Sequence, residues 1–139
     1  MKKTWELKKK VLPQNTDYAG VLWHGEYVNW MEEARIRAFE SSNMPYKDIV
    51  AMGFDFPVIS LQINYLKALF LGEEVIIRTS CCKKKGLRWP WRTMIFNEES
   101  LLAAEAYVEI ILVKRTLDSF KIMRGMPAEI KEYMIFLEK

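Results

Sequence analysis

Histidine and cysteine are scarce in this 139-residue chain. His24 is the single histidine, which excludes a histidine-rich metal site within one chain. The only two cysteines, Cys81 and Cys82, are adjacent, a spacing that matches no zinc or redox motif and offers no disulfide framework. We therefore expect no metal and no cofactor, two small buried or half-buried cysteines in a strand, and a reducing compartment.

Long hydrophobic runs are also missing. The clearest apolar run, residues 110–113, is far below the roughly 18 residues that a membrane span needs. The lysines near the N-terminus precede no apolar targeting segment. Lys and Arg (21) nearly balance Asp and Glu (18), and the aromatic residues do not interleave with a basic stripe. We expect a cytoplasmic protein that binds neither membranes nor nucleic acids.

The chain otherwise has the composition of one folded domain, residues 1–139. Half of its residues are hydrophobic and 28% are charged. A long helix is predicted from about residue 24 to residue 41, a short helical turn over 46–52, and a last helix that Pro127 opens. The long helix is predicted because four residues form one narrow stripe at helical spacing: Tyr27, Met31, Ala34 and Ala38.

Six stretches read as strands: 5–12, 59–65, 74–82, 87–96, 102–112 and 120–124. The stretch 102–112 alternates most strictly, and 59–65 alternates as if one face were buried. Pro90 indicates that the stretch 87–96 lies at a sheet edge or contains a bulge. Short connections favour an antiparallel sheet, so we predict an α+β protein in which a curved antiparallel sheet wraps around one long helix. Apolar residues left on strand faces suggest an oligomer: Trp89, Trp91, Tyr107, Ile111 and Val113.

The candidate site is the loop before the long helix. Asp17 lies in a tight turn with Gly20, and the first backbone N–H groups of a helix have no partner within the helix. A carboxylate beside such a helix start provides two components of acyl transfer. However, an Asp in a turn most often bonds its own backbone, and a residue before a helix is most often a cap. The pattern alone favours this structural interpretation, for His24 as well as for Asp17.

A family resemblance changes that balance. Residues 16–35 read Thr-Asp-Tyr-Ala-Gly-Val-Leu-Trp-His-Gly-x-Tyr-x-x-Trp-Met-Glu-x-Ala-Arg, and the segments 57–59, 63–65 and 71–75 support the same match. This pattern resembles the hot-dog-fold acyl-CoA thioesterases of the 4-hydroxybenzoyl-CoA thioesterase type, including the short acyl-CoA branch related to the Tol-Pal-linked protein. The resemblance implies a hot-dog fold with a C-terminal helix and hydrolysis of an acyl thioester.

The resemblance also implies roles for individual residues. Asp17 matches the family's essential carboxylate, which acts as nucleophile or as general base for water. The backbone N–H matching His24 opens the central helix and polarises the thioester carbonyl, and the His24 side chain is expected to support catalysis. The family's helix glutamate matches Glu32, for which we expect a structural role. We expect four further residues of this region to bind substrate: Tyr18, Gly20, Trp23 and Tyr27.

The partners expected are an acyl-CoA or acyl-carrier-protein substrate and further copies of this chain. Lys83 and Arg88, in a basic turn, would meet the phosphates of coenzyme A or an acidic carrier protein. A solvated turn that blunts a sheet edge is the structural alternative. The resemblance implies a homodimer or homotetramer with acyl pockets between subunits. Two other functions compete: dehydration or isomerisation of a thioester, and a non-catalytic binding module. The identity of the acyl group, short-chain, long-chain or aromatic, stays open.

Overall fold

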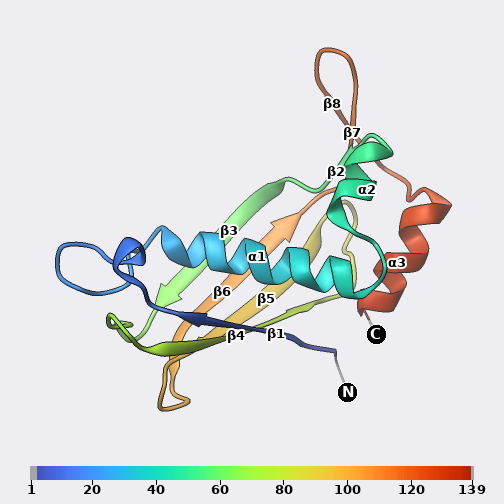
Figure 1. Cartoon of the computed structure of the whole chain (residues 1–139). Coiled ribbons are helices and arrows are strands. Elements are labelled where there is room, and N and C mark those ends of the chain that lie inside the picture. Colours follow the sequence, from blue (N-terminus) through green and yellow to red (C-terminus); the bar gives the residue numbers. More distant parts are fainter. Residues whose placement is uncertain (1–2, 139) are drawn as a thin grey trace.

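A single long helix crosses one face of an antiparallel sheet in the computed structural model, which describes residues 3–138 (Figure 1). The sheet has five strands in the order β1-β4-β5-β6-β3. Their bounds are β1 Trp5–Lys10, β3 Val58–Tyr65, β4 Glu74–Cys81, β5 Trp89–Phe96 and β6 Leu102–Ile110. The long helix is α1 (Glu26–Ser41), and α3 (Ala128–Glu138) closes the chain. The predicted α+β architecture is confirmed.

A second, smaller sheet has the order β2-β7-β8. Its strands are β2 Phe54–Asp55, β7 Val113–Arg115 and β8 Phe120–Ile122, and the short helices are η1 Pro13–Asn15 and α2 Tyr46–Ala51. The sequence predicted β8 but neither β2 nor β7, because two or three residues are too few to show a strand period. Among the described helices, none is long and apolar enough to cross a bilayer.

The helix α1 packs on the sheet through the stripe that its sequence predicts. Ala34 and Ala38 are buried, and their small side chains allow a close approach to β4 and β1. Tyr27 and Met31 are buried on the same face. The helix begins at Glu26, two residues later than predicted, because the Glu26 N–H donates to the Trp23 carbonyl at 2.9 Å and closes a turn first.

Trp89 and Trp91 lie in the core rather than on the surface. Both indoles are buried, and each ring centroid lies 5.7 Å from that of Phe39 on α1. Ile111 and Val113 are also buried, whereas Tyr107 is 45% exposed. The prediction that these residues form leftover apolar surface is therefore wrong, except for Tyr107. β5 is a central strand, so one of its faces lies under α1.

Pro90 also departs from its prediction, because β5 is neither an edge nor bulged at that position. Pro90 has no N–H to donate to the neighbouring strand. Its carbonyl accepts the Cys82 N–H at 2.8 Å, and the indole N–H of Trp89 donates to the Cys82 carbonyl at 3.0 Å. A side chain next to the proline thus supplies the donor that the proline lacks, just beyond the end of β4.

Strand β3 is an edge strand and is exposed on both faces, so the predicted buried face is absent. Only Ile63 is half-buried; Val58, Ile59, Leu61 and Tyr65 are exposed. The reason is that α1 packs over β4 and β1, which lie at the opposite edge of the sheet from β3. This strand therefore presents apolar side chains and an unpaired backbone edge to its surroundings.

Candidate active site

Asp17 lies in a tight hairpin that leads into α1. The Asp17 N–H donates to the Val21 carbonyl at 2.9 Å, and the Trp23 N–H donates to the Asn15 carbonyl at 2.9 Å. These two hydrogen bonds align the segment that carries Asp17 beside the segment that enters the helix. The backbone of Asp17 therefore runs next to the segment that leads into α1, and the catalytic pairing of its carboxylate with the helix start stays a prediction.

Gly20 makes this hairpin possible. Its φ of +79° lies in the left-handed region that favours glycine, and its N–H donates to the Asp17 carbonyl at 3.1 Å. The hairpin is anchored to the chain after β3, because the Leu71 N–H donates to the Gly20 carbonyl at 3.0 Å and the Leu22 N–H to the Leu69 carbonyl at 2.7 Å. Local structure thus explains the glycine at position 20, and its contact with a substrate stays a prediction.

The two carboxylate oxygens of Asp17 have different surroundings. Oδ1 accepts the Ala19 N–H at 2.8 Å and, more weakly, the Val21 N–H at 3.5 Å. Oδ2 accepts no hydrogen bond from the residues that the structure describes. The side chain is half-buried. One oxygen therefore holds the turn, as the structural interpretation requires, and the catalytic role of the carboxylate stays a prediction.

The turn before α1 presents backbone donors. His24 and Gly25 precede the first helical residue, and within residues 3–138 neither of their N–H groups donates to a protein acceptor. The positive end of the helix dipole points in the same direction. The His24 imidazole is exposed, with its centroid 5.0 Å from the Trp23 ring. Such N–H groups, at the start of a helix, are suited to an anion.

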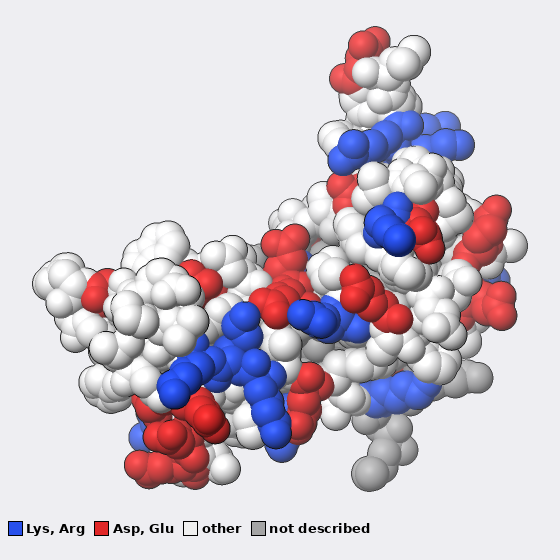
Figure 2. Space-filling view, in the orientation of Figure 1, with Lys and Arg blue, Asp and Glu red and all other residues white. Residues whose placement is uncertain are grey.

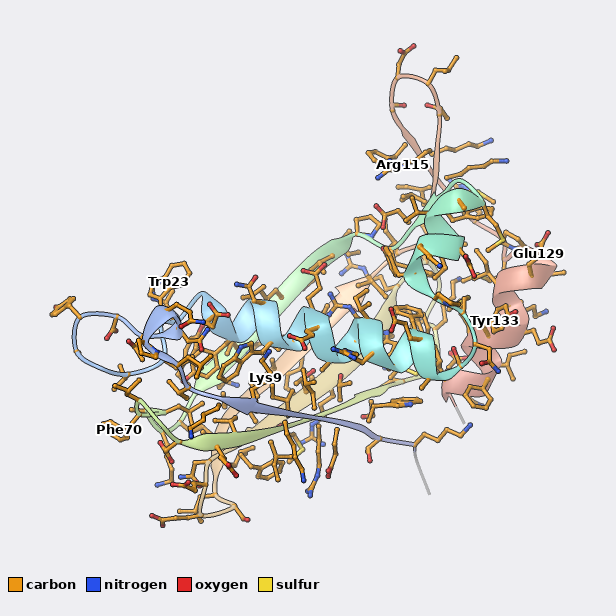
Figure 3. The ribbon with its side chains drawn as sticks, in the orientation of Figure 1. Lys9, Trp23, Phe70, Arg115, Glu129 and Tyr133 are labelled. Atoms are coloured by element: carbon orange, nitrogen blue, oxygen red, sulfur yellow. The ribbon has the colours of Figure 1, made fainter. Side chains whose placement is uncertain are left out.

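The indole of Trp23 packs directly on Gly25. A Cβ atom at Gly25 would lie 2.3, 2.4 and 2.8 Å from three atoms of the six-membered ring, so glycine is required for this contact. Figure 3 shows the Trp23 side chain beside the start of α1. The ring is 47% exposed and covers the turn from one side. Trp23 thus lies beside the start of α1, and its contact with a substrate stays a prediction.

The side chains of Tyr27 and Tyr65 contact each other next to this turn. Their rings meet edge to face, with centroids 4.9 Å apart, and the Tyr65 hydroxyl donates to the His24 carbonyl at 3.0 Å. Burial, aided by Tyr65 and Glu73, raises the pKa of Tyr27 to about 12, so its phenol stays neutral at physiological pH. No local pattern marks Tyr65 as a site residue, because 41 positions separate it from His24.

A polar cluster lies around Arg35, the last residue of the matched motif. Arg35 is buried on α1, and burial lowers its pKa while Glu32 opposes that change. The Tyr46 hydroxyl donates to the Asp55 carboxylate and accepts the Phe56 N–H at 3.1 Å. Burial and the hydrogen bond to Asp55 raise the pKa of Tyr46. The cluster ties α2 to β2 and fits a structural role.

Comparison with known proteins identifies the family. Residues 19–104 match the family model described as the thioesterase superfamily. The Synechocystis protein sll0410, which is named as an esterase, is 34% identical over 99% of this chain and 82% of its own length. The acyl-CoA thioester hydrolase YbgC of Escherichia coli O157:H7 is 26% identical over 75% of this chain and 78% of its own. The chain belongs to the thioesterase superfamily.

A solved structure of this superfamily agrees with the fold. The DHNA-CoA thioesterase of Staphylococcus aureus has a TM-score of 0.86 and 27% identity, and the match covers 97% of this chain and 91% of that one. The predictions of a hot-dog fold and of a thioester hydrolase family are confirmed. The family match begins two positions after Asp17, and the Tol-Pal-linked branch stays a prediction.

Other predicted residues of this thioesterase-superfamily member are either fully exposed or lie away from Asp17 within one chain. Tyr18, at the hairpin tip, is fully exposed. Lys83 and Arg88 follow the far end of β4, whose eight residues span roughly 25 Å. Arg88 is already paired with Glu109 at 2.7 Å. One chain therefore does not bring the basic turn to the carboxylate.

Surface grooves of this member of the superfamily run along β1 instead. Two grooves of about 370 and 310 Å³ share the residues Lys8, Lys9 and Lys10, and neither is lined by Asp17 or His24. Among residues 3–138, no group of three or more His, Cys, Asp or Glu side chains could hold a metal ion. These grooves do not enclose an acyl chain at the candidate site.

Proposed function

We propose that the protein hydrolyses acyl-CoA thioesters to a free acid and a thiol, with Asp17 as the catalytic carboxylate and the N–H of His24 as oxyanion donor. One observation carries this proposal: the Asp17 hairpin runs beside the turn that leads into α1, where the N–H groups of His24 and Gly25 donate to no acceptor among residues 3–138. Family membership and the named activities of YbgC and the DHNA-CoA thioesterase support the substrate class.

The reaction needs little beyond these groups. Oδ2 of Asp17 takes a proton from water, and the hydroxide attacks the thioester carbonyl carbon. The oxyanion that forms accepts the His24 N–H, and the intermediate collapses by breaking the C–S bond. The thiolate leaves and takes up a proton. Direct attack by Asp17, through a mixed anhydride that water then cleaves, uses the same groups.

The second part of the proposal is a homodimer formed through β3. The edge strand β1 ends in three lysines, which discourage strand addition, whereas β3 has no charged residue between Val58 and Tyr65. An uncharged, apolar edge of eight residues is an aggregation hazard unless it is covered. A second copy, related by a two-fold axis, covers it completely and closes the assembly.

The test compares two substitutions of Asp17. Asp17→Asn keeps an Oδ1 that can accept the Ala19 N–H, so we expect the fold to persist while hydrolysis falls by about 10²–10⁴-fold. Asp17→Ala also loses the turn bond and should cost about 1 kcal/mol of stability in addition. Thiol release from a panel of aliphatic and aromatic acyl-CoAs measures the first effect and urea unfolding the second.

The outcomes separate the competing functions. Near-normal turnover by folded Asp17→Asn would end the catalytic assignment. No thiol release by the unmodified protein from any thioester of the panel would favour a non-catalytic binding module, and dehydration products without thiol release would favour a dehydratase.

A further inference from the structure

The turn before α1 contains two successive peptide units whose carbonyl groups are held in different ways. The carbonyl of the first unit, on Trp23, accepts the Glu26 N–H at 2.9 Å, a hydrogen bond within the turn itself. Among residues 3–138, no backbone N–H donates to the carbonyl of the second unit, on His24. Its partner is the hydroxyl of Tyr65, the last residue of β3, at 3.0 Å. A side chain 41 positions away therefore holds the second unit.

The Tyr65 side chain is itself held in place. Its ring meets the Tyr27 ring edge to face, with an interplanar angle of 83°, and Tyr27 is buried against the core. The backbone just beyond Tyr65 is tied to β6, because the Leu66 N–H donates to the Ala103 carbonyl at 2.8 Å. A buried ring and a bonded backbone thus fix the position of the hydroxyl before any substrate binds.

A hydrogen bond to a carbonyl also fixes the N–H of the same peptide unit. Peptide units are planar, and in a trans unit the N–H points opposite to the C=O. The bond from Tyr65 to the His24 carbonyl therefore sets the direction of the Gly25 N–H. In the same way, the bond between Glu26 and Trp23 sets the direction of the His24 N–H. Successive N–H groups in a turn converge on one anion, so these two donors can share one oxyanion.

Backbone groups are the donors that this turn offers to an anion. On the face that Figure 2 shows, the hairpin at the left of the view has mostly uncharged surface, and no Lys or Arg side chain lies over it. The donors that stabilise an oxyanion best are those already aligned, because they need no reorientation while the charge develops. The alignment of the Gly25 N–H is therefore a property that catalysis would use.

We propose that Tyr65 is a positioning residue of the thioesterase reaction, whose hydroxyl holds the His24–Gly25 peptide unit so that the Gly25 N–H joins the His24 N–H on the oxyanion. This inference rests on the proposed function, which uses the His24 donor alone, and adds a second donor with the residue that aligns it. Tyr65 acts through the peptide unit and not on the reacting atoms. Such support from a neighbouring strand is how a rigid site is held to its productive geometry.

The first experiment removes one oxygen atom. Tyr65→Phe keeps the ring that packs on Tyr27 and loses the hydroxyl. The matched control is Tyr107→Phe, because Tyr107 is similarly exposed (45% against 50%) and its hydroxyl donates at 2.9 Å to Glu105 on the same strand.

For Tyr65→Phe we expect kcat for acyl-CoA hydrolysis to fall about tenfold with KM unchanged, since the aligned donor acts mainly in the transition state. The control variant should keep both wild-type values. An unchanged kcat would overturn the inference. A raised KM with unchanged kcat would overturn it as well, because it would show that Tyr65 contributes equally to substrate and transition-state binding.

The second experiment observes the thioester carbonyl without turnover. Acyl-CoA with an isotope label at this carbonyl is bound to Asp17→Asn, and the carbonyl stretching band is recorded by infrared difference spectroscopy. Adding Tyr65→Phe should move the band to higher wavenumber, because a carbonyl with a poorly aligned donor is less polarised. Adding Tyr107→Phe should leave the band in place. A purely structural Tyr65 would not move the band, and an unmoved band would refute the positioning role.

Failure of the proposed function is separable from failure of this inference. If the unmodified protein binds acyl-CoA but hydrolyses no thioester, the band is recorded without Asp17→Asn. A shift caused by Tyr65→Phe would then leave the positioning role standing and refute the hydrolysis. Hydrolysis that depends on Asp17 but is equal in Tyr65→Phe and in the unmodified protein would do the opposite.

Discussion

Gly25→Ala tests how the start of α1 is held. The Gly25 backbone, with φ −75° and ψ −23°, is ordinary helical geometry that alanine adopts without strain. The added methyl group would nevertheless lie 2.3 Å from the nearest ring atom of Trp23, well inside contact distance. Since only a side chain blocks the methyl group, the indole has to move, and the effect of the substitution depends on Trp23.

The size of the effect follows from the buried part of the indole. A tryptophan buries at most about 150–250 Å², and Trp23 is 47% exposed, so about half of that area is covered. At about 25 cal/mol per Å², complete loss of the contact costs about 2–3 kcal/mol. We therefore expect Gly25→Ala to lower the free energy of unfolding by about 1–2.5 kcal/mol. Since His24 lies between the two residues, kcat should fall as well, by less than the about 10²–10³-fold cost of losing an oxyanion donor.

A double-mutant cycle supplies the measurement. Urea unfolding is recorded for the unmodified protein, Gly25→Ala, Trp23→Ala and the double variant. With Trp23 removed, Gly25→Ala should be neutral or stabilising by up to about 1 kcal/mol, because alanine restricts the unfolded chain more than glycine does. The expected coupling energy exceeds 1 kcal/mol. An equal cost of Gly25→Ala with and without Trp23 would refute the steric argument.

Two further outcomes are expected. The folded state keeps Tyr27 protonated up to about pH 12, whereas an unfolded tyrosine ionises near 10, so the free energy of unfolding should fall as the pH rises through this interval. Tyr27→Phe should lose that part of the alkaline slope in urea unfolding, and an unaltered slope would contradict the assignment. Leu61→Lys should convert the dimer to monomers in sedimentation, while Ile135→Lys, at an equally exposed position on α3 (43% for both), should not. A monomeric unmodified protein would exclude the β3 dimer.

A helix or strand can be predicted from the sequence when its hydrophobic pattern extends over many residues and when its apolar face is buried by the same chain. The stripe that includes Ala34 and Ala38 identified α1, and the alternation of residues 102–110 identified β6, a central strand. Both patterns are local, and burial by the rest of the chain decides them. The turn chemistry around Gly20 likewise predicted the bend that holds Asp17.

Elements whose environment depends on distant segments could not be predicted in this way. β3 alternates like a half-buried strand, yet no segment among residues 3–138 buries either of its faces, because α1 lies over β4 and β1, at the opposite edge of the sheet. Pro90 looks unsuited to a central strand until its register is known, since the Trp89 indole then supplies the missing donor to Cys82. The bond from Tyr65 to His24 joins two segments that no local pattern relates.

The site shows why a structural and a catalytic interpretation of one residue need not exclude each other. A turn aspartate that bonds its own backbone uses one oxygen, and Asp17 does this with Oδ1. The same bond fixes the side-chain rotation, so Oδ2 is held in one place without further contacts. A catalytic carboxylate needs this kind of immobilisation, because a freely rotating base is seldom aligned with its water. The turn bond is therefore part of the proposed catalytic device, and the difference between Asp17→Asn and Asp17→Ala measures its two functions separately.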